Sequence, residues 1–411
     1  MMMKPLTYVA LAGLAGMAPS VSGQRIFVTA MAPSGVYPLT WTPSESGGTL
    51  TSEGVTWVNS CGYSPAWLTI DPAGGKMYCL DRSYGFPGYG VYGGISTTWT
   101  VAKNGTFDVV GQVRTDGNVH GSLYGGPNGN KFIAMAGYDD SSLTTYQLPL
   151  DSDSKVLQRQ HWTMSRPGPV KSKQDKPHPY SSLHDPTGKF LLVPDLGADL
   201  IRVFAIDPDF GTLTACRPVQ VGEGDGPRHG AFYQSPGSNA TTFYVVNELG
   251  RSVSVWSATY PPPSDSSGCG GLSLSKTQTI STAAPGASLP EAARAIELQV
   301  FGNHLYVSNS QDETMGPKQD SIVRYAIDPA TGGLTWGEAA NSYAFCPRNF
   351  GINKAGTVLA AAGQASGNVV VIARDPQTGK LGKQLGSVKL GYGPGNAGYE
   401  DGLTSLNWWE P

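Results

Sequence analysis

Short apolar runs separated by turn residues dominate the pattern of hydrophobic and polar positions along the chain. In Ser321–Ile327 (SIVRYAI) and residues 367–375 (GNVVVIARD), β-branched and aromatic side chains are concentrated over a few positions. Runs of this length and composition, bounded by glycine, proline and aspartate, predict strands rather than helices. Residues 289–298 (LPEAARAIEL) alone have a pattern that fits a helical turn.

The apolar runs recur in a larger unit. Each unit has an Asp-Pro-x-Gly type of turn, an apolar strand, and a second strand that ends in another such turn. The unit is clearest in residues 183–213 and returns in residues 298–334 and 351–381. The offsets are roughly 50–65 residues, which is the size of a four-stranded propeller blade and too long for ankyrin or leucine-rich repeats.

Counting the units gives seven. Six are complete and begin near Pro65, Gly121, Ser181, His229, Ala293 and Cys346. The seventh is split, because residues 25–58 provide about three strands and the C-terminal GLTSLNWWEP can supply the fourth. Closure of this first blade by strands from both termini removes open sheet edges. The sequence therefore predicts an all-β, seven-bladed β-propeller, with a two-sheet sandwich as the alternative.

The N-terminus has the features of a secretory signal peptide. Lys4 precedes an apolar run from Leu6 to Met17, and small residues stand before Gln24. The run is too short to span a bilayer. We expect residues 1–23 to be the signal peptide and residues 24–411 to form one propeller domain, secreted to the extracellular space. Sequons at Asn104 and Asn239 fit N-glycosylation on that route.

The five cysteines fit an oxidising compartment. Cys61 and Cys79 stand at the ends of adjacent expected strands and are predicted to pair. Cys216 with Cys269 is a second pairing, which leaves Cys346 as the unpaired thiol. No CxxC spacing or other ligand cluster suggests a metal, and we expect no cofactor.

Composition and charge narrow the class of partner. The net charge of −3 and the scattered lysines and arginines give no reason to expect nucleic acid or a membrane surface. Glycine (54) and proline (31) are abundant, as many tight turns require. A small-molecule ligand and a monomeric protein are the remaining expectations.

Polar residues directly before or after apolar strands are the candidates for chemistry, since propellers bind ligands around the central channel. Arg228 and Arg348 follow prolines before two such strands, and an arginine there offers a charged fork for carboxylate or phosphate. Bridging of neighbouring blades is the competing role for both. Glu248 follows the apolar run FYVVN and is placed for proton transfer, with turn capping as its alternative.

Five segments in one order carry a family resemblance: HDPTGKFLLVPDLGADLIRVFAID, GPRHGAFY, YVVNEL, LYVSN and PRNFGIN. Together they resemble the seven-bladed propeller lactonases, which include 6-phosphogluconolactonases and 3-carboxy-cis,cis-muconate cyclases. The resemblance implies a site of one histidine, two arginines and one glutamate. The first arginine maps onto Arg228 and the glutamate onto Glu248. The histidine position holds Tyr180 and the second arginine position holds Ser310.

These two departures leave two functions open. The first is a secreted lactonase or cycloisomerase that acts on a small carboxylated or sugar-derived lactone, or on its open-chain form. Its expected catalytic residues are Glu248, Arg228, His178 and Tyr180. Its expected substrate-binding residues are His229, Arg348, Arg294, Asn247 and Ser310. The second is a propeller that has lost catalysis and serves as an extracellular binding or surface glycoprotein, with residues 260–272 as a recognition loop.

Overall fold

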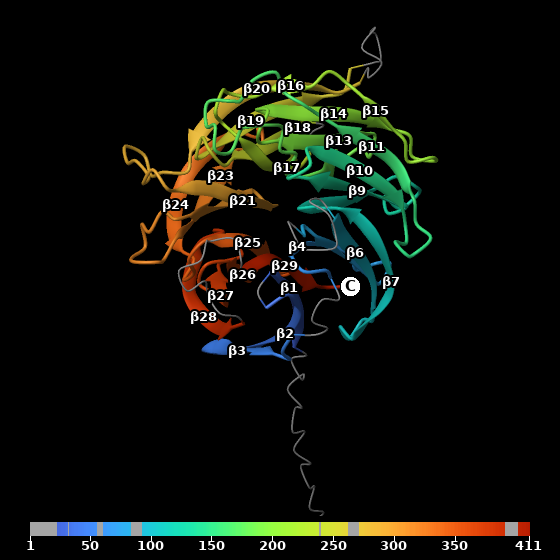
Figure 1. The fold of residues 1–411 in the computed structure, drawn as a ribbon. Helices are drawn as coiled ribbons and strands as arrows, with labels where there is room; N and C mark the ends of the chain where they lie inside the picture. The colour runs from blue at the N-terminus through green and yellow to red at the C-terminus, as the bar shows by residue number, and fades with distance from the viewer. Residues whose placement is uncertain are drawn as a thin grey trace, which may run out of the picture.

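Seven antiparallel sheets are arranged as the blades of a ring, as Figure 1 shows. The structure is a computed structural model that describes residues 23–31, 33–55, 61–83, 93–237, 240–261, 271–390 and 402–411. Residues 1–22 of the predicted signal peptide, Asn239, Cys269 and most of the predicted recognition loop lie outside these residues. The described residues contain no α-helix.

The described residues form 29 strands, which follow one another blade by blade along the chain. The second to fourth blades are β4 (Pro65–Asp71), β5 (Lys76–Asp81), β6 (Gly93–Val101), β7 (Phe107–Asp116); β8 (His120–Tyr124), β9 (Phe132–Gly137), β10 (Ser142–Gln147), β11 (Val156–His161); and β12 (Leu183–His184), β13 (Phe190–Asp195), β14 (Leu200–Ile206), β15 (Leu213–Ala215), β16 (Val219–Gln220). The fifth to seventh blades are β17 (Pro227–Gln234), β18 (Thr241–Asn247), β19 (Ser252–Thr259), β20 (Ser273–Ser281); β21 (Arg294–Phe301), β22 (His304–Ser310), β23 (Ser321–Ile327), β24 (Leu334–Asn341); and β25 (Pro347–Ile352), β26 (Val358–Gly363), β27 (Asn368–Arg374), β28 (Leu381–Lys389).

The first blade is assembled from both ends of the chain. Its order is β29 (Leu403–Trp409), β1 (Gln24–Ala30), β2 (Gly35–Ser44) and β3 (Gly47–Ser52). β29 pairs antiparallel with β1, with Arg25 opposite Trp409, and the two strands lie side by side near the centre of the ring in Figure 1. The predicted closure is therefore confirmed. The strands β1, β2 and β3 supply the three strands expected within residues 25–58.

The strands follow a gradient of burial from the channel outward. The second strand of a blade is covered on both faces by neighbouring blades, so β13, β18 and β26 are buried at every position. The outermost strands β11 and β20 alternate between exposed and half-buried positions. This gradient explains why some runs are continuously apolar while others are mixed, since only strands buried on both faces lack a polar side.

The recurring turns connect one blade to the next. Buried tyrosines donate hydrogen bonds to glycine carbonyls in the Asp-Pro turns of the following blade: Tyr124 to Gly211 (2.6 Å) and Tyr244 to Gly332 (2.7 Å). Both glycines have φ +71°, a conformation that side chains other than glycine rarely adopt. The repeated motif thus supplies the contact between blades as well as the turn.

Three sequence expectations can be compared directly with the strands. Each complete blade begins within two residues of its predicted start. The helical turn predicted over residues 289–298 is wrong, because β21 starts at Arg294 and pairs with β22. Cys61 and Cys79 form the predicted disulfide with a Cα–Cα distance of 5.7 Å, and Cys346 is free and buried, as predicted.

Candidate active site

A ring of seven residues closes the central channel partway along its length. Each lies at the start of the innermost strand of a blade, or just before it. We call these seven residues the floor ring: Ala66, Val119, Tyr180, Arg228, Ile296, Arg348 and Thr404.

β-Bulges direct floor-ring side chains into the channel. In β17, Pro227 pairs with Asn247 and His229 pairs with Val246, so Arg228 is an extra residue without a partner in the ladder. The same shift occurs between Pro347 and Asn349 in β25. A bulge bends the strand and turns its extra side chain away from the regular alternation. This local irregularity explains why Pro-Arg precedes two apolar strands in the sequence.

A second set of residues stands directly after the second strand of a blade. We call these the rim residues: Arg82 after β5, Tyr138 after β9, Glu248 after β18, Gln311 after β22 and Gln364 after β26. Each emerges from a strand that neighbouring blades bury, so its side chain enters the channel mouth from a fixed backbone.

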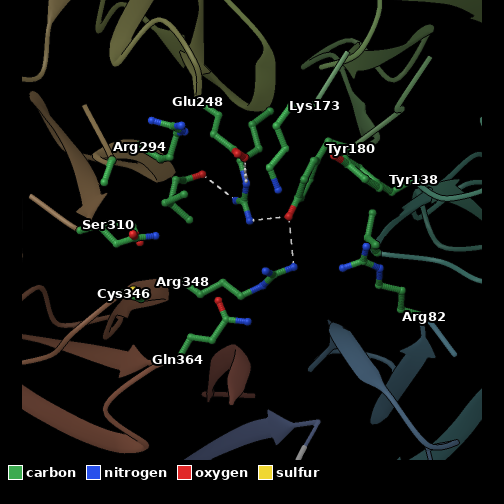
Figure 2. Close-up of a pocket in the computed structure, with 15 residues that line it drawn as sticks. Arg82, Tyr138, Lys173, Tyr180, Glu248, Arg294, Ser310, Cys346, Arg348 and Gln364 are labelled. Carbon is green, nitrogen blue, oxygen red and sulfur yellow. Dashed lines mark hydrogen bonds and ion pairs between the residues drawn. The ribbon is translucent and has the colours of Figure 1, made fainter. Parts of the chain in front are cut away.

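Rim residues and the floor ring together enclose a cavity of about 300 Å³, which we call the arginine cavity (Figure 2). Five cationic residues line it, Arg82, Lys173, Arg228, Arg294 and Arg348, against one carboxylate, Glu248. Figure 2 shows Arg82, Lys173, Glu248, Arg294 and Arg348 converging from different parts of the ring. An excess of positive charge in a partly enclosed site favours an anionic ligand.

Arg228 is the most constrained of these cations. Its side chain is 2% exposed, and Nε lies 3.0 Å from Glu248 Oε2 in an ion pair without hydrogen-bond alignment. Nη1 donates to the Ile296 carbonyl at 2.6 Å. Burial disfavours the charged form, but Tyr180 and Glu248 outweigh it and raise the pKa of Arg228 above its usual value. Arg228 therefore stays charged and is held by the protein.

Tyr180 accepts hydrogen bonds from two guanidinium groups. Arg228 Nη2 donates to its hydroxyl at 2.7 Å and Arg348 Nη2 donates at 3.1 Å, as the dashed lines in Figure 2 show. The Arg228 guanidinium also lies over the Tyr180 ring, 4.1 Å from its centroid. A phenol oxygen that accepts twice still has its own O–H to donate. That proton is available to a ligand in the cavity.

The structure brings together six of the nine residues predicted for the site. They line the arginine cavity and are Tyr180, Arg228, Glu248, Arg294, Ser310 and Arg348. Arg348 shares the Tyr180 hydroxyl with Arg228 and lines the same cavity as Ser310, the position at which the family resemblance implies a second arginine. Arg294 donates to the backbone carbonyls of Glu291 and Ala293 at 2.7 Å.

The other three predicted residues do not line this cavity. His178 stacks on Tyr138 with centroids 4.1 Å apart, and its ring nitrogens lie 2.7 Å from the Tyr138 carbonyl and 2.8 Å from Asp175 Oδ1. It therefore supports Tyr138. Asn247 is fully buried and donates to Ser252. His229 lies on the opposite side of the floor ring.

Sequence reasoning missed Arg82, Tyr138, Lys173, Gln311 and Gln364. Arg82 forms an ion pair with Asp139, with Nε 2.6 Å from Oδ2. The rule that selected Glu248, a polar residue directly after an apolar strand, would have found four of the five. Lys173 lies on a long connection and carries no such signal.

Among the described residues, no cluster of histidine, cysteine, aspartate and glutamate is arranged to hold a metal. The same residues contain no helix that is long and apolar enough to cross a membrane.

Comparisons with known proteins agree with this architecture. The family model described as "Lactonase, 7-bladed beta-propeller" matches residues 27–393. A probable 6-phosphogluconolactonase of Arthroderma benhamiae is 32% identical over 329 residues, which are 80% of this chain and 78% of the relative. The 6-phosphogluconolactonase of Yersinia enterocolitica is 28% identical over 80% of this chain and 85% of the relative.

A solved structure of a lactonase has the same fold. The periplasmic gluconolactonase of Pseudomonas aeruginosa superimposes with a TM-score of 0.74 at 25% identity, covering 94% of this chain and 99% of that protein. The match extends over the whole ring of blades. The chain belongs to the seven-bladed β-propeller lactonase family.

Proposed function

We propose that this protein is a secreted lactone hydrolase that opens the lactone ring of a sugar acid carrying an anionic group. The observation that carries the proposal is the arginine cavity, where five cationic residues surround one carboxylate in a lactonase-family propeller. The relatives named as 6-phosphogluconolactonases and a gluconolactonase support a sugar-derived lactone as the substrate class.

Glu248 is the proposed general base. One carboxylate oxygen, Oε2, contacts Arg228, and no hydrogen bond within the described chain reaches the other oxygen, Oε1. A water molecule held by Oε1 can attack the lactone carbonyl carbon while its proton passes to the carboxylate. Negative charge then develops on the carbonyl oxygen, and the guanidinium group of Arg348 is placed to stabilise it.

Tyr180 is the proposed proton donor to the leaving oxygen. When the ring carbon–oxygen bond breaks, the alkoxide takes the Tyr180 proton, and the proton on Glu248 returns to Tyr180 through water. The product is an open-chain hydroxy acid, and ionisation of its new carboxyl group releases one proton to solution. This assignment gives Tyr180 a chemical role at the position where the family resemblance implied a histidine.

Secretion is the second part of the proposal. The Cys61–Cys79 disulfide supports it, because such bonds persist in oxidising compartments. Asn104, the acceptor of one predicted sequon, is exposed in a turn where Thr106 donates to its Oδ1. Both features agree with the predicted signal peptide.

The test is hydrolysis of 6-phosphogluconolactone and glucono-δ-lactone by the secreted chain, followed as acid release above the spontaneous rate. We expect turnover by the native protein and loss of at least about a hundred-fold in kcat for Glu248→Gln. Glu338→Gln, on the outer strand β24, is the matched control and should retain full activity. Absence of turnover on both lactones and on 3-carboxy-cis,cis-muconate would instead favour an extracellular binding protein.

A further inference from the structure

The channel opens into a second cavity on the far side of the floor ring. It has a volume of about 360 Å³, and we call it the histidine cavity; its polar lining includes His120, His229, Glu297, Asn349 and Asn407. The innermost strands run from the arginine cavity toward it, since Arg228 lines the first and His229 the second. A small void of about 10 Å³ lies at the floor ring, and residues of both cavities, including Arg228 and His229, line it.

Two imidazole rings at the base of this cavity have unused hydrogen-bonding capacity. His120 Nδ1 accepts from the Ser182 backbone at 3.3 Å, which leaves Nε2 as its N–H group. Within the described chain, no hydrogen bond reaches His120 Nε2 or either ring nitrogen of His229, whose Nε2 is 3.9 Å from Glu297 Oε2. His229 is 4% exposed. These nitrogens are able to pair with a ligand or water in the cavity that both rings line.

Glu297 completes the polar base of the cavity. Its Oε1 accepts from the Leu298 backbone at 2.9 Å and its Oε2 accepts from Asn349 Nδ2 at 2.7 Å. Burial raises the pKa of Glu297 to about 7, so below neutral pH the carboxyl is largely protonated and can also donate. The base of the histidine cavity therefore offers hydrogen-bond donors and acceptors side by side, and its net charge depends on the protonation of Glu297.

The charges around the cavity disfavour an ionic ligand. Burial, followed by repulsion from Arg228, lowers the pKa of His120 to about 3 and that of His229 well below its usual value. Both rings are neutral at physiological pH, and the same guanidinium field disfavours a cation. An anion would meet Glu297 and Glu410 without any cation to pair with in the described lining.

We propose that the histidine cavity is a second binding site, which takes a neutral, polyhydroxylated ligand such as a sugar ring. Hydroxyl groups both donate and accept, so they can pair with the imidazoles, the Glu297 carboxyl and the Asn349 amide together. The indoles of Trp67 and Trp408 supply the apolar surface against which C–H faces of a sugar pack. This site is independent of the lactonase reaction proposed above.

The experiment compares three matched probes, glucose, gluconate and protonated glucosamine, by titration calorimetry at about pH 6, where Glu297 is mostly protonated. Glucose should bind the native protein. Glu297→Gln should weaken that binding by roughly ten-fold, as expected when hydrogen-bond partners change, and His120→Phe should do the same. Arg294→Ala, in the arginine cavity, should leave glucose binding unchanged.

Glucose binding that is insensitive to both histidine-cavity variants but lost in Arg294→Ala would overturn the proposal, because it would place the sugar in the arginine cavity. Absence of glucose binding, or stronger Glu297-dependent binding of gluconate or glucosamine, would overturn it as well. Thermal unfolding of each variant confirms that the ring of blades is intact. Lactone turnover is measured separately, so failure of this site and failure of the proposed enzyme activity remain distinguishable.

Discussion

The two ends of the channel are built from the same innermost strands, yet they have opposite chemical character. Five cationic side chains line the arginine cavity. The Arg228–Glu248 ion pair and the hydrogen bond from Arg228 to the Tyr180 hydroxyl hold charged groups at the cavity wall. The histidine cavity gathers neutral imidazoles, amides and a carboxyl whose pKa is raised to about 7. Adjacent residues, such as Arg228 and His229, belong to different cavities.

The bulge is the feature that makes this division possible. In a regular strand Arg228 would point into the packing between blades, because successive side chains alternate between the two faces. The extra residue turns it into the channel instead, above His229. β21 repeats the arrangement, with Ile296 in the floor ring and Glu297 in the histidine cavity. One irregularity repeated in several blades therefore separates a charged site from a neutral one.

Removal of the Arg228 side chain should have the largest effect on the difference between the two cavities. Arg228→Ala leaves Glu248 without its ion partner and Tyr180 without one of its two donors. We expect a loss of about 3 kcal/mol in the free energy of unfolding, near the lower end for a broken buried pair, together with loss of lactonase activity. Urea unfolding measures the first effect, with Arg294→Ala as the matched variant. Equal stability of the two variants would show that Arg228 does not organise the site.

The pH dependence of stability should distinguish the neutral cavity from the charged one. Folding raises the pKa of Glu297 from 4.5 to about 7, so its stabilising contribution is full below pH 4.5 and is lost as pH rises through 7. Relative to Glu297→Gln, the native protein should lose about 3 kcal/mol between pH 4.5 and pH 8, from about 1.4 kcal/mol per pKa unit. Denaturant unfolding across this range provides the measurement. Parallel curves for the two proteins would refute the prediction.

Removal of the Tyr180 hydroxyl should affect the charged cavity alone. Tyr180→Phe takes away the proton donor and the oxygen shared by Arg228 and Arg348. We expect kcat to fall by roughly ten- to a hundred-fold with a smaller change in KM, because the donated proton matters most in the transition state. Steady-state kinetics test this expectation. A rise in KM with unchanged kcat would make Tyr180 a binding residue only.

Arg294 should produce the smallest effect. Arg294 donates hydrogen bonds to backbone carbonyls at the rim of the arginine cavity. It contributes positive charge to the cavity but, unlike Arg228, it is not one partner of a buried ion pair. Arg294→Ala should raise KM for an anionic lactone a few-fold with little change in kcat, and the difference should shrink at high salt, which screens exposed charges. Arg294→Lys, which retains the charge, should restore most of the affinity. Equal KM values in all three proteins would place the ligand away from Arg294.

Local sequence rules found Glu248, Arg228 and Arg348 because each stands at a fixed distance from an apolar strand. His178, two residues before Tyr180, was also expected among the catalytic residues, but it does not line the arginine cavity. The chain around Tyr180 is not a regular strand: Pro179 pairs with Asp195 in an isolated bridge, whereas Leu183 pairs with Leu192. The register shifts by one residue only after Tyr180, because the Tyr180 N–H donates to the Pro194 carbonyl and the Leu196 N–H to the His178 carbonyl. The His178 ring is instead held by contacts with Tyr138 and Asp175. Spacing along a sequence cannot reveal such contacts.

The sequence by itself determined the repeated blades, their starting points, the closure by both termini and one disulfide. These features depend on local composition, turn residues and a pattern of period two, all of which can be identified in short segments of the sequence. The tertiary structure decided which residues share a cavity, because Arg82, Tyr138, Glu248 and Arg348 come from different blades and meet only when the ring closes. It also decided that Arg228 and His229 enter opposite ends of the channel, since a bulge forms from the pairing of two strands and not from one strand alone.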